Sequence, residues 1–151
     1  MTMIKKLFFY IMLLTLVSCG YEPLYSNKTA FNLAIQSFQV EGNKNLNRKI
    51  ISSLNLKNKT KATGYRLIIN SNKSVEAVSK DATGKTSAYR TKIDVKIILM
   101  DGVKLFKQKD FSSNFTYNNI ENKFDLSQYQ REIEINLING IIEKIFIFLT
   151  F

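Results

Sequence analysis

The sequence predicts an α+β domain, a two-layer sandwich in which a mostly antiparallel sheet of about four strands carries two helices on one face. Residues 86–100 largely alternate between apolar and polar side chains, which is typical of a strand with one buried face. An Asp-Gly pair at 101–102 then indicates a tight turn into another strand. Residues 126–148 instead repeat apolar side chains every three or four positions, as an amphipathic helix does. The expected order is strand, helix, three strands, helix, because a half-polar sheet needs helices over its apolar face.

Residues 1–18 are expected to be a lipoprotein signal peptide and not part of the fold. Lys5 and Lys6 precede an apolar run at 7–17 that is too short for a transmembrane helix, which needs about 20 residues. The run closes on Leu-Val-Ser-Cys at 16–19, which resembles the lipobox of bacterial lipoproteins. In that family the cysteine sulfur receives a diacylglycerol, cleavage falls before the cysteine, and the new amino group is acylated.

Cys19 would thus become the first residue of the mature protein, and two or more acyl chains give stable anchoring where one does not. Gly20 follows it. An Asp at that position favours inner-membrane retention in the better-studied lipoproteins, so the resemblance implies the periplasmic face of the cell outer membrane. Residues 19–30 would be a lipidated tether, and 31–151 a single α+β domain.

A strand and a short helix are expected to open this domain. Residues 31–40 alternate apolar side chains imperfectly and predict the first strand, which the turn-forming Glu-Gly-Asn at 41–43 ends. Asn45 is a suitable N-cap for a helix that has leucine or isoleucine at every fourth position. We expect this helix to end near residue 56.

A long hairpin follows a polar loop at 58–64. Residues 65–80 predict an extended segment, with a bulge or bend at the weakly patterned 70–72. Turn-forming residues at 81–84 then reverse the chain, so that 86–100 should run antiparallel to the preceding strand. The polar face of that third strand carries Arg90, Lys92, Asp94 and Lys96.

The last strand and the last helix complete the domain. The Asp-Gly link at 101–102 leads into residues 103–117, the predicted fourth strand. Asp125, with Gln128 three residues later, forms a capping-box pattern and predicts a helix start. We expect about six turns of helix, which Gly140 weakens without ending. Its apolar face would comprise Leu126, Tyr129, Ile133, Leu137, Ile141, Ile145 and Phe148.

The composition argues against an enzyme. The chain has no His, and its single cysteine is the one expected to be acylated, so the commonest general base, metal ligand and thiol nucleophile are missing. The acids are scattered singly except for Glu132 and Glu134, whose two-residue spacing directs them apart on a helix. We therefore expect no catalytic residue, no metal site and no cofactor other than the diacylglycerol and N-acyl chain on Cys19.

The formal charge of +10 is concentrated in the middle of the chain. Between Lys28 and Lys109 there are 17 Lys and Arg residues and only five acids. Such a field raises the local concentration of polyanions, so the candidate ligands are nucleic acid, anionic lipid headgroups and phosphorylated glycolipid. An exported, acylated protein rarely meets nucleic acid, and we expect no nucleic-acid partner.

The residues that follow the lipobox resemble one envelope family more closely. Residues 19–25, Cys-Gly-Tyr-Glu-Pro-Leu-Tyr, are similar to the Cys-Gly-aromatic-x-Pro-Leu-Tyr opening of the LptE family of lipopolysaccharide-assembly lipoproteins. The expected order of strands and helices is also similar to that family's fold. Its members are anchored at the outer membrane as the small plug and scaffold partner of a β-barrel translocon, the LptD family, and they bind lipopolysaccharide during its delivery.

The resemblance implies binding and assembly without covalent chemistry. Cations of the chain would meet the phosphates of lipid A, for which Lys and Arg are suitable donors. The candidate lipopolysaccharide-binding residues are Lys80, Lys85, Arg90, Lys92 and Lys96. A basic strand face is more often a solvated surface, so only a cluster of these residues would be informative.

Other functions stay open. The anchor and the charge suit equally well an envelope polyanion- or peptidoglycan-associated periplasmic lipoprotein that has no barrel partner. A small glycan hydrolase is the weakest alternative. Residues 141–151 are apolar almost all round, more than a two-layer domain requires, and are expected to pack in the core or to dock a partner or the membrane surface.

Overall fold

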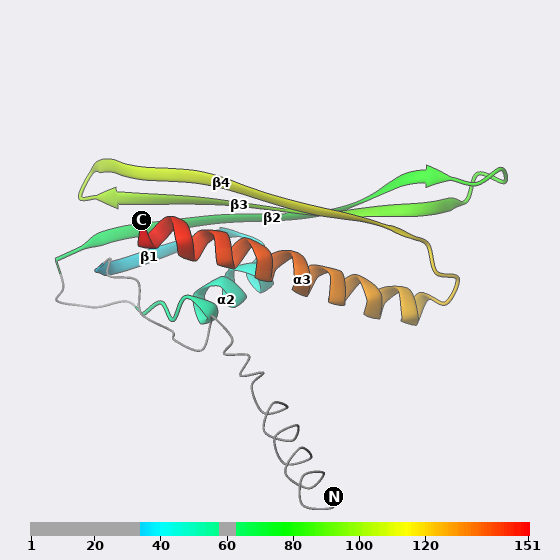
Figure 1. Ribbon diagram of the computed structural model, residues 1–151, viewed down its shortest axis with the longest axis horizontal. Coiled ribbons are helices and arrows are strands. Elements are labelled where there is room, and N and C mark those ends of the chain that lie inside the picture. Colours follow the sequence, from blue (N-terminus) through cyan, green and yellow to red (C-terminus); the bar gives the residue numbers. More distant parts are fainter. Residues whose placement is uncertain (1–33, 58–62) are drawn as a thin grey trace, which may run out of the picture. The chain divides into compact units, whose positions relative to one another are not determined.

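The computed structural model describes residues 34–57 and 63–151, and it confirms the predicted α+β class (Figure 1). The sheet contains β1 (Ile35–Gly42), β2 (Tyr65–Lys80), β3 (Thr86–Asp101) and β4 (Lys104–Asn118), side by side in that order. β1 pairs with β2 in parallel, and the other two pairs are antiparallel. The helices are α2 (Lys44–Ser53) and α3 (Lys123–Thr150). The predicted signal peptide and tether, including Cys19, lie outside the described residues.

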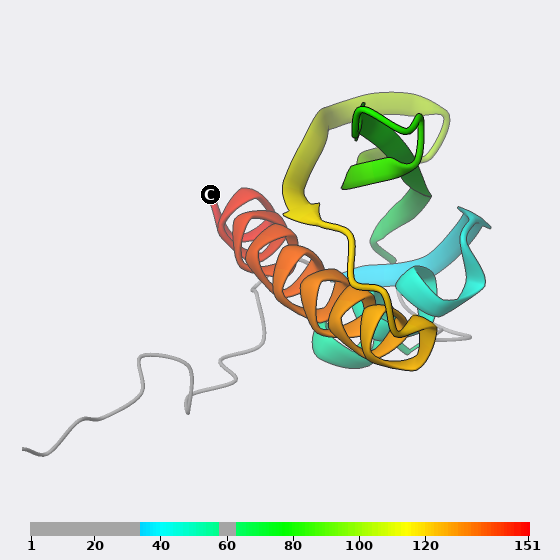
Figure 2. The same cartoon turned by 90° about the vertical axis from the view of Figure 1, so that its right-hand side faces the viewer.

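Both helices cover the same face of the sheet (Figure 2). The short helix α2 packs mainly on β1 and β2, while α3 packs on β3 and β4 and also contacts α2. The core between the two layers is aliphatic, because alternate residues of each strand point at the helices. Its fully buried members are Leu46, Ile50, Leu67, Ile69, Ile93, Val95, Ile97, Leu99, Ile138, Ile141, Ile145 and Leu149.

Helix α2 begins two residues earlier than the sequence predicted. Its N-cap is Asn43, whose side-chain oxygen accepts hydrogen bonds of 3.1 Å from the backbone N–H groups of Asn45 and Leu46. Asn45 is therefore inside the first turn. The reason is Gly42, which ends β1 with a φ of 88° and lies so close to the Ser71 carbonyl that a Cβ would collide with it. This turn delivers Asn43 directly to the capping position.

The same helix also ends earlier than residue 56. Its last residue is Ser53, and Leu54 is the C-cap. Asn55 then adopts a left-handed φ of 50°, a conformation that stops a helix and that asparagine tolerates better than most residues.

The bulge predicted at 70–72 is absent. β2 pairs with β3 without interruption from Arg66 to Ala77, and register shifts occur only beyond that point, at 77–80. The polar residues in the middle of β2 instead bond to neighbouring elements. The buried hydroxyl of Ser71 donates to the side-chain oxygen of Asn47 on α2 at 2.7 Å. Asn47 in turn donates to the Glu41 carbonyl at 2.9 Å.

The β3–β4 turn is shifted by one residue from the prediction. Asp101 pairs with Lys104, so the two loop residues are Gly102 and Val103, and β4 begins at Lys104. Gly102, with a φ of 57°, takes the first loop position, where tight hairpins favour glycine. Shortly afterwards β4 contains a bulge, because Phe106 is an extra residue between the two pairs that β3 forms there.

The last helix is longer than the six turns expected. It has 28 residues, close to eight turns, and its N-cap is Asn122 and not Asp125. Asp125 lies in the first turn, where its negative charge is favourable beside the helix N-terminus. The buried stripe contains Ile133, Ile141 and Ile145 as predicted, and also Ile138 and Leu149. Tyr129 is exposed, whereas Leu126, Leu137 and Phe148 are partly buried.

Candidate functional site

The five predicted phosphate-binding cations are all exposed, but they fall into two separate groups. Lys80 ends β2 and Lys85 lies in the turn before β3; we call these two the tip cations. Arg90, Lys92 and Lys96 lie on the outer face of the sheet, opposite the helices; we call these three the face cations. Lys80 pairs with Thr86 of β3, and Lys96 lies ten residues further along that strand, which corresponds to roughly 33 Å. The five cations therefore cannot converge on one phosphate.

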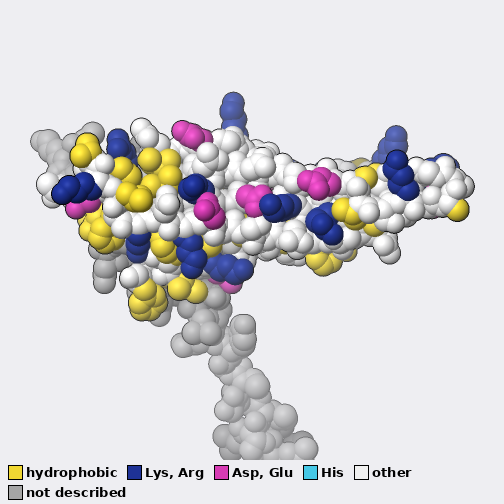
Figure 3. All heavy atoms as spheres, turned by 90° about the horizontal axis from the view of Figure 1, so that it is seen from above, with side chains coloured by type: hydrophobic (Ala, Val, Ile, Leu, Met, Phe, Trp, Pro, Cys, Tyr) yellow, Lys and Arg dark blue, Asp and Glu magenta, His cyan; other side chains and the backbone are white. Residues whose placement is uncertain are grey.

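The face cations are interspersed with acids. Lys92 Nζ lies 2.9 Å from Asp94 Oδ2, and Lys96 Nζ lies 3.9 Å from Asp110 Oδ1 on β4. Figure 3 looks onto this outer face and shows basic and acidic side chains alternating along it. The face is therefore hydrophilic and locally close to neutral, and does not concentrate positive charge.

Asp94 is held ionised within this network. Partial burial of its carboxyl acts to raise its pKa, but hydrogen bonds from Ser112 and Lys92, together with the positive charge of Lys92, outweigh the burial. The net result is a pKa below the usual value for aspartate. The ion pair with Lys92 thus persists well below neutral pH.

Arg90 differs from the other face cations. Its Nε donates a hydrogen bond of 3.2 Å to the Thr116 hydroxyl on β4, and its cross-strand neighbour on β2 is Glu76. No ion pair of Arg90 is found among the described residues. Its guanidinium therefore keeps donors available for an anion.

The tip of the β2–β3 hairpin has a defined turn. Asp81 Oδ1 accepts hydrogen bonds from the backbone N–H groups of Thr83 at 2.8 Å and Lys85 at 3.0 Å, and from the Thr83 hydroxyl at 2.7 Å. The Thr83 hydroxyl bond is the main cause of the lowered pKa of Asp81. Gly84, with a φ of 82°, closes the turn. The tip cations are thus held on an ordered turn, and Figure 1 shows this hairpin extending beyond the N-terminal end of α3.

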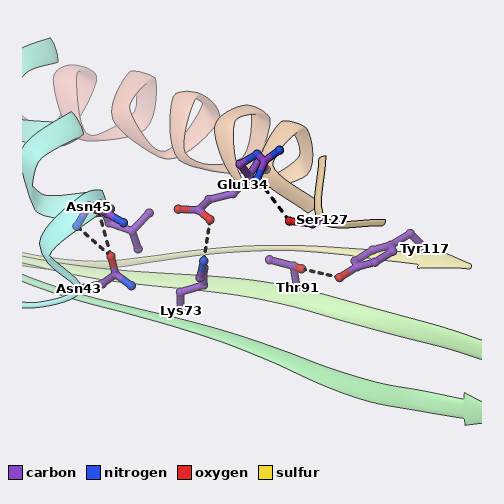
Figure 4. A network of polar contacts seen from close by, with 9 residues as sticks. Asn43, Asn45, Lys73, Thr91, Tyr117, Ser127 and Glu134 are labelled. Atoms are coloured by element: carbon purple, nitrogen blue, oxygen red, sulfur yellow. Dashed lines mark hydrogen bonds and ion pairs between the residues drawn. The ribbon is translucent and has the colours of Figure 1, made fainter. Parts of the chain in front are cut away.

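A polar layer between the sheet and α3 was not predicted from the sequence. Lys73 of β2 lies on the face that carries the core, and its Nζ is 2.6 Å from Glu134 Oε2 of α3. Nearby, the hydroxyls of Thr91 and Tyr117 are 3.2 Å apart and buried (Figure 4). The signal was present in the alternation: Leu67, Ile69, Ser71 and Lys73 share one face, which therefore turns polar along the strand.

A shallow hollow of about 460 Å³ lies beside the exposed side of α2. The described residues that line it are Asn45, Arg48, Lys49, Ser52 and Ser53. These residues are polar or basic.

Residues 34–57 and 63–151 contain neither a metal-binding cluster nor a membrane-spanning helix. No three His, Cys, Asp or Glu side chains there gather closely enough to hold a metal ion. No helix in those ranges combines the length and the apolarity that crossing a bilayer requires.

Comparisons with known proteins find the fold and no relative in sequence. No family model matches the chain, and no curated protein matches it in sequence. A minor lipoprotein of Acinetobacter baumannii matches with a TM-score of 0.58 and 12% identity, covering 78% of this chain and 92% of its own. A lipoprotein of Caulobacter crescentus matches with a TM-score of 0.53 and 14% identity, covering 75% of this chain and 87% of its own. Lipoprotein B of Nitrosomonas europaea matches with a TM-score of 0.53 and 8% identity, covering 76% of this chain and 81% of its own. The chain thus has a fold that is found in bacterial lipoproteins.

Proposed function

We propose that this chain is a lipid-anchored outer-membrane protein that acts as the small plug and scaffold partner of a β-barrel translocon of the LptD family. Its role would be in lipopolysaccharide transport, with direct binding of lipopolysaccharide and no catalytic step. The observation that carries the proposal is a conjunction: the lipobox ending at Cys19 and the family-like opening at 19–25 precede a domain that shares its fold with bacterial lipoproteins.

The outer sheet face supports the scaffold role. A plug inside an outer-membrane barrel meets a polar, hydrated wall, because the interior of such barrels is polar. On this face Lys92 pairs with Asp94 of the same strand, and Lys96 lies close to Asp110 of β4. The face therefore offers hydrogen bonds and charges of both signs to such a wall. It also carries little net charge, which avoids repulsion by either sign of partner.

The tip cations, with Arg90, are the better candidates for contact with lipid A phosphates. Among the described residues no ion pair involves Lys80 or Lys85, whereas Lys92 and Lys96 are already close to carboxylates. A phosphate that approached Lys92 would have to compete with Asp94, whose lowered pKa keeps it charged. At the tip the nearby carboxylate is Asp81, whose Oδ1 accepts hydrogen bonds from Thr83 and from the backbone N–H of Lys85, and among the described residues it forms no ion pair with either lysine side chain.

The barrel partnership is tested by co-purification. The full chain, expressed at its native level and extracted from membranes in mild detergent, is expected to be recovered with a large outer-membrane β-barrel that mass spectrometry identifies. Recovery as a free monomer only would contradict the scaffold role. It would favour the alternative, an envelope lipoprotein that binds polyanions or peptidoglycan without a barrel.

Anchoring is tested by lipid labelling. Radiolabelled palmitate is expected to enter the wild-type chain and to be absent from Cys19→Ser, because no other thiol is available. Equal labelling of both chains would refute acylation at Cys19.

Lipopolysaccharide binding is tested with two matched double variants. Lys80→Gln with Lys85→Gln is expected to reduce capture of lipopolysaccharide several-fold at low salt and to weaken its salt dependence. Lys92→Gln with Lys96→Gln removes the same formal charge from the outer face and is expected to have a much smaller effect. Equal losses from both pairs would show that only net charge matters and would contradict a site at the tip.

A further inference from the structure

One end of the domain exposes several large apolar side chains. It contains the β3–β4 turn and the beginning of β4, and the end of α3 is beside it, since Lys107 Nζ contacts the Phe148 carbonyl at 2.6 Å. We call Val103, Leu105, Phe106 and Phe151 the apolar end; their exposed fractions are 91%, 53%, 51% and 96%. Figure 3 shows apolar side chains gathered at this left-hand end, with basic ones among them. An exposed apolar patch of this kind marks a contact surface.

The loop geometry presents these side chains outward. Gly102 turns the chain so that Val103 stands at the very tip of the hairpin, almost fully exposed. The bulge at Phe106 then interrupts the alternation, so that Phe106 and Lys107 both face the helix side. The ring centroids of Phe106 and Tyr65 are 4.8 Å apart. The tip is thereby supported by packing behind it. Its exposed side chains therefore belong to a hairpin that packs on the rest of the domain.

Positive charge surrounds the apolar end. Residues 101–109 contain three lysines, at 104, 107 and 109, and a single acid, Asp101. Arg66 lies on β2 level with Met100, and its Nε is buried without a hydrogen-bond partner among the described residues. Apolar and aromatic side chains rimmed by Lys and Arg are the composition that binds an anionic membrane interface.

The start of β1 lies beside the same surface. β1 starts at this end, because the Tyr65 N–H donates to the Ala34 carbonyl at 2.8 Å and Arg66 pairs with Met100 beside the β3–β4 turn. Residues 20–34 separate this point from Cys19, and fifteen residues span at most roughly 50 Å even when fully extended. An anchor on Cys19 would therefore keep the apolar end within reach of the bilayer.

We propose that the apolar end docks on the anionic surface of the membrane that holds the lipid anchor, with Val103, Leu105, Phe106 and Phe151 entering the headgroup region. The lysines contact lipid phosphates, and the hairpin tip at Gly84 points away from the membrane. The inference takes its membrane from the proposed acylation of Cys19, but it does not depend on a barrel partner.

The experiment relies on the fact that the chain has a single cysteine. Once Cys19 is acylated, a cysteine introduced elsewhere is the only free thiol. Val103→Cys and, at the opposite tip, Ala82→Cys are labelled with an environment-sensitive dye in the full acylated chain. Both chains are reconstituted in vesicles of phosphatidylethanolamine and phosphatidylglycerol that contain a brominated lipid as quencher. We expect quenching several-fold stronger at 103 than at 82; equal quenching at the two positions would overturn the proposal.

A second variant tests the apolar side chains without risk to the fold. Val103→Asp with Phe151→Asp changes two almost fully exposed residues, in a chain labelled at Leu105→Cys. Quenching is expected to fall to the level of the label at 82, while the control Ala82→Asp is expected to leave it unchanged. Undiminished quenching in the double Asp variant would contradict insertion. In vesicles of phosphatidylcholine alone we expect weaker quenching, and equal values would overturn the role of the lysines.

Other occupants give different results. If a second copy covered this end, the label at 103 would shift its emission with protein concentration in detergent before any vesicle is added, which would overturn the proposal. Failure of barrel co-purification leaves the vesicle result untouched, because no barrel is present. Dye that reacted with the wild-type chain would refute acylation of Cys19, from which this inference takes its membrane, and would therefore overturn the inference as well.

Discussion

The interface between α3 and the sheet has two halves of opposite character. Toward its C-terminus α3 buries Ile138, Ile141, Ile145 and Leu149 against an aliphatic sheet face. Toward its N-terminus the same helix meets the sheet through the ion pair of Glu134 with Lys73 and through the ring of Tyr129, which packs on Tyr117. Within the sheet, the Tyr117 hydroxyl contacts that of Thr91 beneath the helix (Figure 4). We call these the aliphatic half and the polar half.

The difference shows which half provides stability. Buried aliphatic groups contribute roughly 25 cal/mol per Å² removed from water. In a partly buried ion pair, the lost hydration of the two charges largely offsets their attraction. The aliphatic half should therefore hold the helix on the sheet. The polar half should instead fix how the two layers are aligned, at little gain in stability. Three predictions test this division, and a fourth concerns a residue outside both halves.

The largest effect is expected in the aliphatic half. Ile141→Ala removes a fully buried side chain and should lower the free energy of unfolding by about 3 kcal/mol, within the range for core truncations. Ile147→Ala, on the exposed side of the same helix, should cost less than about 1 kcal/mol. Urea unfolding of both variants measures the difference. Similar losses would contradict the assignment of α3 residues to the core.

A smaller effect is expected from the hydroxyl pair. Tyr117→Phe removes one partner of the contact with Thr91 and should cost about 1 kcal/mol, while the ring contacts with Tyr89 and Tyr129 remain. In Thr91→Val with Tyr117→Phe both polar groups are gone, so the double variant should lose less than the two single losses combined. Strictly additive losses in the same unfolding assay would show that the hydroxyls do not interact.

A still smaller effect is expected from the ion pair. Lys73→Met keeps the length of the side chain but removes its charge, and should change the free energy of unfolding by less than about 1 kcal/mol. The matched variant is Glu134→Gln. A loss of several kcal/mol in either would mean that the polar half, and not only the aliphatic half, holds the helix in place.

The smallest effect is expected outside both halves, at Asp94 on the outer face. Its pKa is lower in the folded chain than in the unfolded one, so its contribution to stability is complete above the unfolded value of about 3.9. The contribution is lost as the pH falls through the folded value. Asp94→Asn should therefore be slightly less stable than the wild type at neutral pH, and the gap should close in acid. A gap that widens below pH 4 would refute this.

The contrast between the two halves also explains why residues 141–151 are so apolar. The sequence alone could not separate a core helix from a docking segment, because both are apolar. The structure buries Ile141, Ile145 and Leu149 and leaves Ile147 and Phe151 exposed. Part of the excess apolarity is thus core, and only the remainder is available to another surface.

Local patterns predicted the hairpin strands well and the helix starts poorly. The bounds of β2 and the start of β3 follow from alternation and turn residues, which depend on near neighbours only. Both N-caps were missed because several Asn and Asp residues could cap each helix. Which one does so depends on where the preceding turn delivers the chain, as Gly42 does for Asn43.

The candidate site was predicted only in part for the same reason. Alternation along one strand correctly exposes Arg90, Lys92 and Lys96. It cannot tell that Lys96 faces Asp110, because this contact depends on the register between β3 and β4, which the bulge at Phe106 changes. The charge of a surface therefore needs the register of its strands, and composition alone overstated how basic this face is.

The parallel pairing of β1 has a consequence for the order in which the chain folds. Strands β2, β3 and β4 are joined by short turns, so their contacts are close in sequence and cost little loop-closure entropy. β1 can join only after α2 has crossed over, since parallel neighbours cannot be linked by a tight turn. We expect the three-stranded meander of β2, β3 and β4 to form first and β1 to be recruited late, so a partly folded chain at that stage would already have its two hairpins while β1 is still unpaired.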